Sequence, residues 1–439
     1  MPSIPRSEPR AAPSLELVAF ERYLLADDCE RYPMQFHCRL HFTGRLQRDA
    51  LEAAHSEALA RHPLLTSIVR GTAFQPCEEA PPLDWFECEP RSSMPPFAYW
   101  DIRQAPPIRV TVVQGSRSCE LVARIHHVAI DGTGAQDFLG DLLTIYADRL
   151  TGTRTDRLKP LDPRRLRRRG ELGLTFAKRL RRLPSDLASL FRARGFYKRR
   201  PLALSDRPRD SSLPMTEECS LRHCFGKEET AAIHRQAAEN KASVNSLLLS
   251  RLFSAIDEFR PGSSDWLRIA VPINMRQVGD RRMPAANLVS MVFLDRPRSA
   301  LENPARLLED ISNEMEAVKR DELGLRLTRA LEWEKWLPGK WFRKVVRRNR
   351  AWATTMLTNI GPALPGCRLP RREGRFVVGD AVLEEFDLIP IVRPFQPVNF
   401  AVATYAGRLS LTARVDTRAI ALQDAKRLFD GYVRQFNPR

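Results

Sequence analysis

The chain has 439 residues, 43% of them hydrophobic, which is enough apolar volume for two or three cores at about 150 residues per domain. Its formal net charge of +17 comes from two segments, because residues 149–209 carry +15 and residues 326–350 carry +7. The remainder is slightly acidic, which argues against a protein coated along its length by nucleic acid. No C-x-x-C pair, no secretory segment and no run of about 18 apolar residues is present, so we expect a cytoplasmic protein without a disulfide framework.

Alternating apolar residues from Phe36 to Phe42 predict a half-buried strand at the start of the first lobe. Gly44 ends this strand, and apolar residues spaced three and four apart predict a helix from Leu46 to just before Pro63. A second copy of this arrangement follows Gly226, with helices predicted at about 227–239 and 244–259 and with Ser243 as the N-cap of the second helix. Since strands and helices mix in both copies, we predict a mixed α/β sandwich of two similarly built lobes.

A segment rich in Arg and Pro separates the two copies and predicts a crossover linker. Within it, apolar residues from Leu172 to Phe191 fall at helical spacing and indicate a basic amphipathic helix. We therefore divide the chain into an N-terminal lobe (1–151), a basic linker (152–212) and a C-terminal lobe (213–439). The C-terminal lobe is predicted to hold further strands at 267–273, 287–294, 354–358 and 375–392, a hairpin at 398–415, and helices at 303–320 and from 421.

One motif points to chemistry. A predicted strand ending at Ile125 runs into His126-His127-Val128-Ala129-Ile130-Asp131-Gly132, and a predicted helix follows. An imidazole with a pKa near 6.5 is a suitable general base at neutral pH. The alternative is a histidine pair at the end of a strand, one packed and one exposed, with Asp131-Gly132 as an ordinary turn.

This heptapeptide resembles the H-H-x-x-x-D-G signature of the thioester-dependent acyltransferase superfamily. The superfamily includes chloramphenicol acetyltransferase, peptide synthetase condensation domains, polyketide-associated acyltransferases and wax ester synthases. Segments at 61–63 (Arg-His-Pro), 243–248, 271–276, 287–290 and 358–362 are similar, in the same order, to segments of the condensation and wax ester synthase groups. The resemblance implies two chloramphenicol-acetyltransferase-like lobes that form a pseudo-dimer with a tunnel between them.

The same resemblance implies roles for individual residues. It makes His127 the general base, and it makes His126, Asp131 and Gly132 supports of the motif, with Asp131 paired to an arginine for which Arg276 is the candidate. Candidates for a hydrogen bond to the oxyanion or substrate are Thr358, Asn359 and Asn287; the alternative for the first two is that they cap the turn before Gly361. The chain lacks the D-F-G-W-G segment of the plant enzymes, and it has Asn274 where condensation domains often carry Arg.

A second basic segment, residues 331–352, holds four of the seven tryptophans. Trp336, Trp341, Lys344 and Arg347 belong to a pattern typical of a helix in an anionic lipid interface. One alternative is a set of buried tryptophans beside a solvated face, and another is a docking surface for an acyl carrier protein or the phosphates of coenzyme A. Nucleic acid is disfavoured as a partner because no nucleic-acid-binding motif accompanies the segment.

These features together predict an acyltransferase that uses an acyl-coenzyme A or acyl carrier protein thioester as co-substrate, with no bound cofactor and no metal. We favour an alcohol acceptor and an ester product over an amine acceptor and a condensation-type amide product. The alternative from another class is a non-catalytic, condensation-like protein that binds a carrier protein or a membrane surface. A third is a basic membrane- or nucleic-acid-binding protein whose motif is accidental. We expect the protein in the cytoplasm, where the basic tryptophan segment would attach it to the inner face of the membrane.

Overall fold

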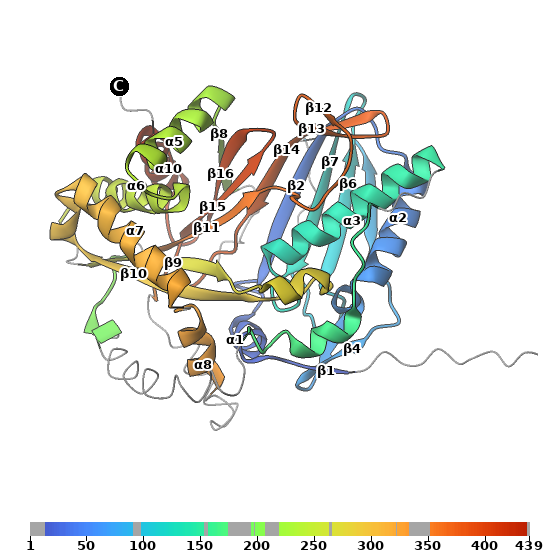
Figure 1. Cartoon of the computed structure of the whole chain (residues 1–439), viewed down its shortest axis with the longest axis horizontal. Coiled ribbons are helices and arrows are strands. Elements are labelled where there is room, and N and C mark those ends of the chain that lie inside the picture. The colour runs from blue at the N-terminus through green and yellow to red at the C-terminus, as the bar shows by residue number, and fades with distance from the viewer. Residues whose placement is uncertain are drawn as a thin grey trace, which may run out of the picture.

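The computed structural model describes residues 14–90, 98–152, 157–173, 195–196, 198–206, 219–262, 266–321, 323–332 and 352–436. These residues form two lobes that lie side by side, each with its own sheet and its own helical layer (Figure 1). The mixed α/β architecture with two lobes is confirmed. Among the described helices, none is both long and apolar enough to cross a membrane.

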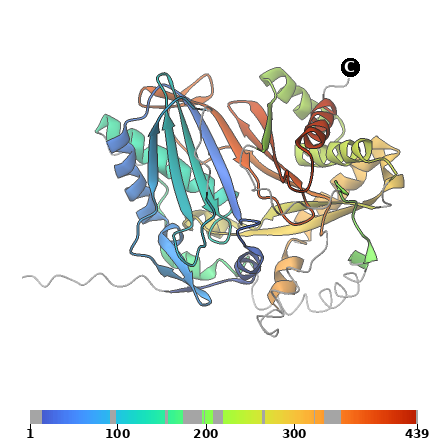
Figure 2. The same cartoon turned by 180° about the vertical axis from the view of Figure 1, so that it is seen from behind.

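The first lobe is built on a seven-stranded sheet of order β12-β13-β14-β2-β7-β6-β5. Its strands from the first half of the chain are β2 (Gln35–Thr43), β5 (Leu83–Glu87), β6 (Ile108–Gln114) and β7 (Ser118–His126). Two helices, α2 (Arg48–Arg61) and α3 (Gly132–Thr151), pack together on one face, and Figure 2 shows the sheet from the opposite face. A small sheet lies beside them, formed by β1 (Leu15–Glu16), β4 (Ala73–Pro76) and β3 (Ser67–Arg70), the last preceded by the 3-10 helix η1 (Pro63–Thr66).

The second lobe has a six-stranded sheet of order β10-β9-β11-β15-β16-β8. The strands are β8 (Ser220–Cys224), β9 (Trp266–Asn274), β10 (Val289–Pro297), β11 (Thr355–Pro362), β15 (Val398–Tyr405) and β16 (Arg408–Val415). The helices are α5 (Lys227–Glu239), α6 (Val244–Phe259), α7 (Pro304–Arg320) and α10 (Leu422–Arg434). The predicted N-cap is present, since the Ser243 hydroxyl accepts from the Ser246 N–H at 3.0 Å.

Three strands from the second half of the chain complete the first sheet. They are β12 (Arg371–Arg372), β13 (Arg375–Val378) and β14 (Ala381–Ile389), and β14 pairs antiparallel with β2. Arg222 of β8 makes ion pairs with Glu385 at 2.9 Å and Asp387 at 2.6 Å, so β14 is also tied to the second sheet. Residues 213–439 therefore contribute to both sheets, and this crossover fixes the lobes relative to each other.

Two short helices lie below the junction of the lobes: α1 (Ala19–Asp27) and α8 (Leu325–Glu332), which contact each other (Figure 1). Sequence periodicity did not predict α1. Its Glu21 is buried, which raises the pKa of the carboxyl, and it pairs at 2.7 Å with Arg169 after the 3-10 helix η2 (Pro163–Arg168). The predicted linker helix lies outside the described residues from position 174 onward.

Candidate active site

The histidine motif lies at the end of β7, in the segment His126–Gly132, which we name the base loop. β7 ends at His126, and α3 begins at Gly132 with Asp131 as its N-cap, accepting from the Gly134 N–H at 2.9 Å. The backbone N–H of His127 donates to the Met34 carbonyl at 2.7 Å. A strand end and a capped helix thus hold the loop from both sides.

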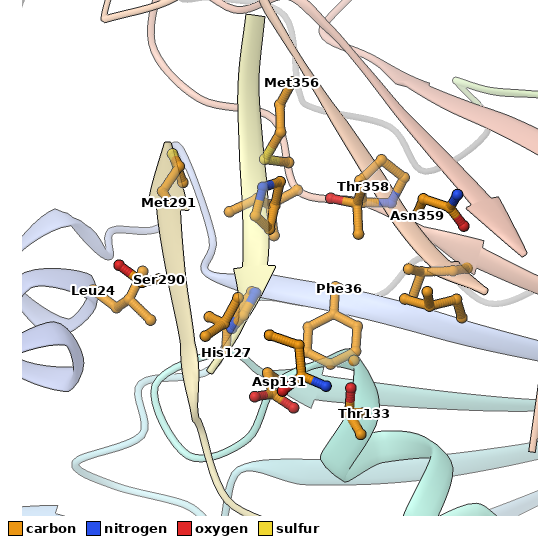
Figure 3. Close-up of a pocket in the computed structure, with 18 of the residues that line it drawn as sticks. Leu24, Phe36, His127, Asp131, Thr133, Ser290, Met291, Met356, Thr358 and Asn359 are labelled. Carbon is orange, nitrogen blue, oxygen red and sulfur yellow. The ribbon is translucent and has the colours of Figure 1, made fainter. Parts of the chain in front are cut away.

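A cavity of about 160 Å³ lies above the base loop, between the two sheets. Most of its lining is apolar, and the residues come from α1, β2, β10 and β11, including Phe20, Leu24, Phe36, Val289, Met291 and Met356. Figure 3 shows His127, Phe36 and Thr358 facing this space from different elements. The site is therefore formed by both lobes together.

His127 lines this cavity and is partly exposed to it. Its Nδ1 is buried without a hydrogen-bond partner from another residue in the described part of the chain, so Nε2 is the ring nitrogen that faces the cavity. Burial lowers the pKa of the imidazole, against opposing effects of its own carbonyl and of Asp131. The Phe36 ring lies 5.0 Å away, edge to face. A neutral imidazole with one accessible nitrogen is the form that can take a proton.

Asp131 points away from the cavity centre and makes a two-pronged ion pair with Arg276. The guanidinium nitrogens lie 2.7 and 2.9 Å from the two carboxylate oxygens. Burial pushes the pKa of Asp131 up, but Arg276 and the N–H groups of Gly134 and Leu288 outweigh it and hold that pKa below its usual value. Since Arg276 follows β9 of the second lobe, this pair connects the base loop to the other lobe.

His126 is fully buried and faces the interior of the first lobe. Its Nε2 lies 3.4 Å from the carboxylate of Asp28, and its Nδ1 accepts from the Val128 N–H at 3.4 Å. Asp28 also accepts from the Tyr99 hydroxyl at 2.9 Å and from the Met34 N–H at 2.8 Å. Because Met34 holds the backbone of His127, the His126–Asp28 pair supports the base loop from below.

On the other side, the base loop meets Ala285–Leu288, the residues just before β10, which we name the bracing segment. Asn287 donates through Nδ2 to the backbone carbonyl of His127 at 2.6 Å, and Leu288 donates its N–H to Asp131 at 2.8 Å. Asn287 is buried and is not among the residues that line the cavity. Its amide is thus directed to the backbone of His127 and not to the cavity, where an oxyanion would form.

Thr358 and Asn359 of β11 both line the cavity across from the base loop. The side-chain carbonyl of Asn359 accepts from the Gly361 N–H at 2.9 Å, which caps the turn as the alternative interpretation proposed. Gly361 itself has a positive φ of 67°, which favours glycine. In Figure 3 the Thr358 hydroxyl points into the cavity, whereas the Asn359 amide points away from the space in front of His127.

Packing between the lobes, and not a turn with positive φ, explains the glycine at position 132. It is not among the described glycines with positive φ, so the conformational freedom of glycine is not what the position uses. A Cβ at Gly132 would instead lie 3.2 Å from the side chain of Ile360, and one at Gly134 would lie 3.0 Å from the Ala286 carbonyl oxygen. Both glycines allow the second lobe to approach the start of α3.

The proposed interfacial residues Trp336, Trp341, Lys344 and Arg347 lie outside the described residues. At the end of that segment, Trp352 is described. It packs against Phe293 at 5.8 Å, Phe196 at 6.1 Å and Tyr23 at 6.1 Å. This tryptophan is therefore part of an aromatic cluster that joins β10 to α1.

Sequence patterns did not identify most of the residues that line the cavity. Phe20 and Leu24 lie on α1 at a spacing of four, a helical signal that was present but short. Pro272, Met291 and Met356 lie on strands whose sequence gives no sign of which face meets the cavity. In the described ranges, no three His, Cys, Asp or Glu side chains gather to hold a metal ion.

Comparison with known proteins gives two findings. Residues 285–438 match the family model of the WS/DGAT C-terminal domain. No curated protein sequence matches the chain.

Solved structures share the fold over nearly the whole chain. The first condensation domain of the calcium-dependent antibiotic synthetase is 15% identical, with a TM-score of 0.70 and coverage of 97% of this chain and 96% of that one. The starter condensation domain of rhizomide synthetase, in complex with C8-CoA, is 13% identical (TM-score 0.69, 97% and 94%). Polyketide synthase associated protein 5 from Mycobacterium tuberculosis is 15% identical (TM-score 0.63, 97% and 98%).

At these identities the structures establish the fold, which is that of condensation domains. With the WS/DGAT match, they confirm the resemblance to the thioester-dependent acyltransferase superfamily that was recognised from the histidine motif.

Proposed function

We propose that the chain is an acyltransferase that moves an acyl group from a thioester to a hydroxyl acceptor, with His127 as general base. The observation that carries the proposal is the position of His127, neutral and half-buried, with one ring nitrogen open to a cavity between the lobes. Both lobes fix its backbone, through Met34 on one side and Asn287 on the other. Such fixed orientation is what a general base requires.

The reaction needs no covalent enzyme intermediate. Nε2 of His127 takes the proton of the acceptor hydroxyl while its oxygen attacks the thioester carbonyl carbon. The tetrahedral intermediate carries its negative charge on the former carbonyl oxygen, which accepts a hydrogen bond from the Thr358 hydroxyl. When the intermediate collapses, the carbon–sulfur bond breaks, and the thiolate leaves with the proton from His127.

The lining of the cavity supports an apolar acyl group. Phe20 and Leu24 of α1, Met291 of β10 and Met356 of β11 supply apolar surface without a charged group. Methionine side chains adapt to chains of different shape, since they are unbranched and flexible. The rhizomide synthetase domain, which shares the fold, is in complex with C8-CoA.

The surface beside the cavity supports an anionic donor such as coenzyme A or a carrier-bound thioester. The 3-10 helix η3 (Val278–Arg282) begins four residues after Asn274, which lines the cavity. It contacts η2, since Arg165 donates to the Gly279 carbonyl, and the two helices carry six exposed or partly exposed arginines. They are Arg164, Arg165, Arg167, Arg168, Arg281 and Arg282, of which Arg168 is paired with Glu171. Phosphate groups or an acidic carrier protein would be attracted to this surface.

A hydroxyl acceptor is favoured because residues 285–438 match the family model of the WS/DGAT C-terminal domain. The condensation fold alone does not separate ester from amide formation. An amine acceptor is therefore the second candidate, and the experiment includes it.

The test is the release of free thiol from acyl-coenzyme A donors of short to long chain, each offered with fatty alcohols, diacylglycerol or amines. Wild type and His127→Ala are assayed side by side, with circular dichroism and thermal melting as controls for folding. We expect release that depends on the acceptor, that yields an ester detectable by mass spectrometry, and that is lost in His127→Ala. Silence with both coenzyme A and carrier-bound thioesters would instead favour a non-catalytic binding protein.

A further inference from the structure

The Arg61-His62-Pro63 turn contains a buried histidine that the proposed reaction does not use. His62 lies between α2 and η1, its side chain is fully buried, and it is not part of the wall of the His127 cavity. Its ring packs edge to face against Phe138 of α3 at 5.8 Å. Both of its ring nitrogens nevertheless have partners.

The partners of His62 come from different lobes. Nε2 lies 3.2 Å from the carboxylate of Asp141 on α3, which also accepts from Arg61 at 2.6 Å. Nδ1 accepts from the backbone N–H of Ala285 at 2.9 Å. Because Nδ1 accepts the hydrogen bond from Ala285, it carries no proton. The single proton of the ring is therefore on Nε2, which donates it to the Asp141 carboxylate. Asp141 thus selects the form of His62 that can bind Ala285.

Ala285 is the first residue of the bracing segment, and each residue that follows is bound to the first lobe or to its ion pair. The carbonyl of Ala286 accepts from Arg276 at 2.9 Å, which in turn pairs with Asp131. Asn287 holds the carbonyl of His127, and Leu288 donates to Asp131. His62 is therefore at one end of a continuous run of contacts whose other members reach the base loop.

We propose that His62, oriented by Asp141, is a positioning residue for the base His127. The proposal rests on the proposed function and extends it. By fixing the N–H of Ala285, His62 sets where Asn287 presents its amide to the carbonyl of His127. The orientation of the imidazole in the cavity follows from that contact, although His62 touches neither the cavity nor the reacting atoms.

Two substitutions separate the two contacts of His62. In His62→Asn the side-chain oxygen falls near the position of Nδ1, so it keeps an acceptor for Ala285 and loses Asp141. In His62→Gln the longer amide reaches toward Asp141, so it keeps that contact and loses the acceptor for Ala285. The matched control is His55, a buried residue of α2 that packs against the same Phe138 ring at 6.3 Å and whose Nε2 has no hydrogen-bond partner in the described part of the chain.

Two measurements are made on the full chain. The first is kcat and KM for the acceptor-dependent thiol release. The second is the titration of His127 by NMR of protein labelled with 13C in its histidine rings, with the resonance assigned by its loss in His127→Ala. The NMR measurement does not depend on turnover, so it tests the positioning of His127 even if the proposed activity is not found.

We expect His62→Gln to lower kcat by about tenfold with little change in KM, because a misplaced base slows chemistry more than binding. The His127 resonance and its titration midpoint should shift in His62→Gln, and His62→Asn should restore most of both. His55→Gln should leave both unchanged.

The proposal is overturned if His62→Gln folds and leaves the His127 titration as in wild type. It is also overturned if His62→Asn, His62→Gln and His55→Gln lower kcat equally and in step with thermal stability, which is the behaviour of a residue that only stabilises the fold. If His62→Gln shifts the His127 titration but the wild type shows no acyl transfer, the proposed function alone is rejected.

Discussion

The base loop and the bracing segment meet at His127, but they are built differently. In the base loop, side chains make the contacts: His127 faces the cavity, His126 binds Asp28, and Asp131 binds Arg276. In the bracing segment, backbone groups of Ala285, Ala286 and Leu288 make the contacts, and Asn287 alone acts through its side chain. The comparison shows that the geometry of a site can depend equally on the side chains of a recognisable motif and on a segment that acts mainly through its backbone.

The largest expected effect is the loss of turnover in a His127 variant, which should differ in kind from the effect of substituting His126. His127→Ala should lower acceptor-dependent turnover by about 10²–10⁴-fold, the usual contribution of a positioned general base, with little loss of stability. His126→Ala should instead destabilise the protein, because it leaves the Asp28 carboxylate buried beside a cavity. Steady-state assays and thermal melting of both variants check this. Equal losses of stability would contradict the different roles.

The ion pair between the two regions is the next test. Arg276→Ala should lower the free energy of unfolding by about 3 kcal/mol, because it leaves Asp131 buried without its cation. Denaturant titration measures the change, and Arg168→Ala, which removes an exposed ion pair with Glu171, is a control expected to change little.

The lowered pKa of Asp131 adds a pH dependence to this prediction. The pair should contribute fully above the ordinary pKa of 3.8, and its contribution should be lost as the pH falls through the lower value of the folded state. A wild type and an Arg276→Ala variant with the same stability at neutral pH would contradict the account.

A smaller effect is expected from the glycines at the start of α3. In Gly134→Ala the new methyl group meets the Ala286 backbone, which cannot move aside without shifting the bracing segment. In Gly132→Ala it meets a single methyl group of Ile360 at 3.2 Å, a side-chain contact that is relieved by a shift of a few tenths of an ångström. We expect Gly134→Ala to reduce kcat several-fold more than Gly132→Ala, at a cost in stability of about 1–2 kcal/mol. Steady-state kinetics and thermal melting of the two glycine variants test this. Equal kcat values would contradict the role of the bracing segment in positioning His127.

The sequence predicted the elements that have strong periodicity or clear caps. The helix from Val244 to Phe259 with its Ser243 cap, and the hairpin at 398–415, are present as expected. The strand–motif–helix arrangement around His127 was visible because a base loop needs particular side chains. The pairing of Asp131 with Arg276, 145 residues apart, came only from the family resemblance.

Other features could not be predicted because they depend on lobe packing. The crossing of β14 into the first sheet is a matter of strand pairing, which the alternating pattern of β14 does not specify. The role of Asn287 differs from the one expected, because the same amide can serve an oxyanion or a backbone carbonyl, and only the fold decides which is in reach. The contact of His62 with Ala285 involves a backbone N–H, which every residue except proline offers.

The most direct test of His127 as a general base is the pH dependence of kcat/KM for acceptor-dependent thiol release, which reports the pKa of the free enzyme. Burial lowers the pKa of His127, and the base works only when it is unprotonated. The account predicts a rate that is constant near neutral pH and falls in acid with a midpoint below the ordinary value of 6.5, matching the NMR titration of His127. A midpoint well above 6.5, or a similar profile that persists in His127→Ala, would contradict it.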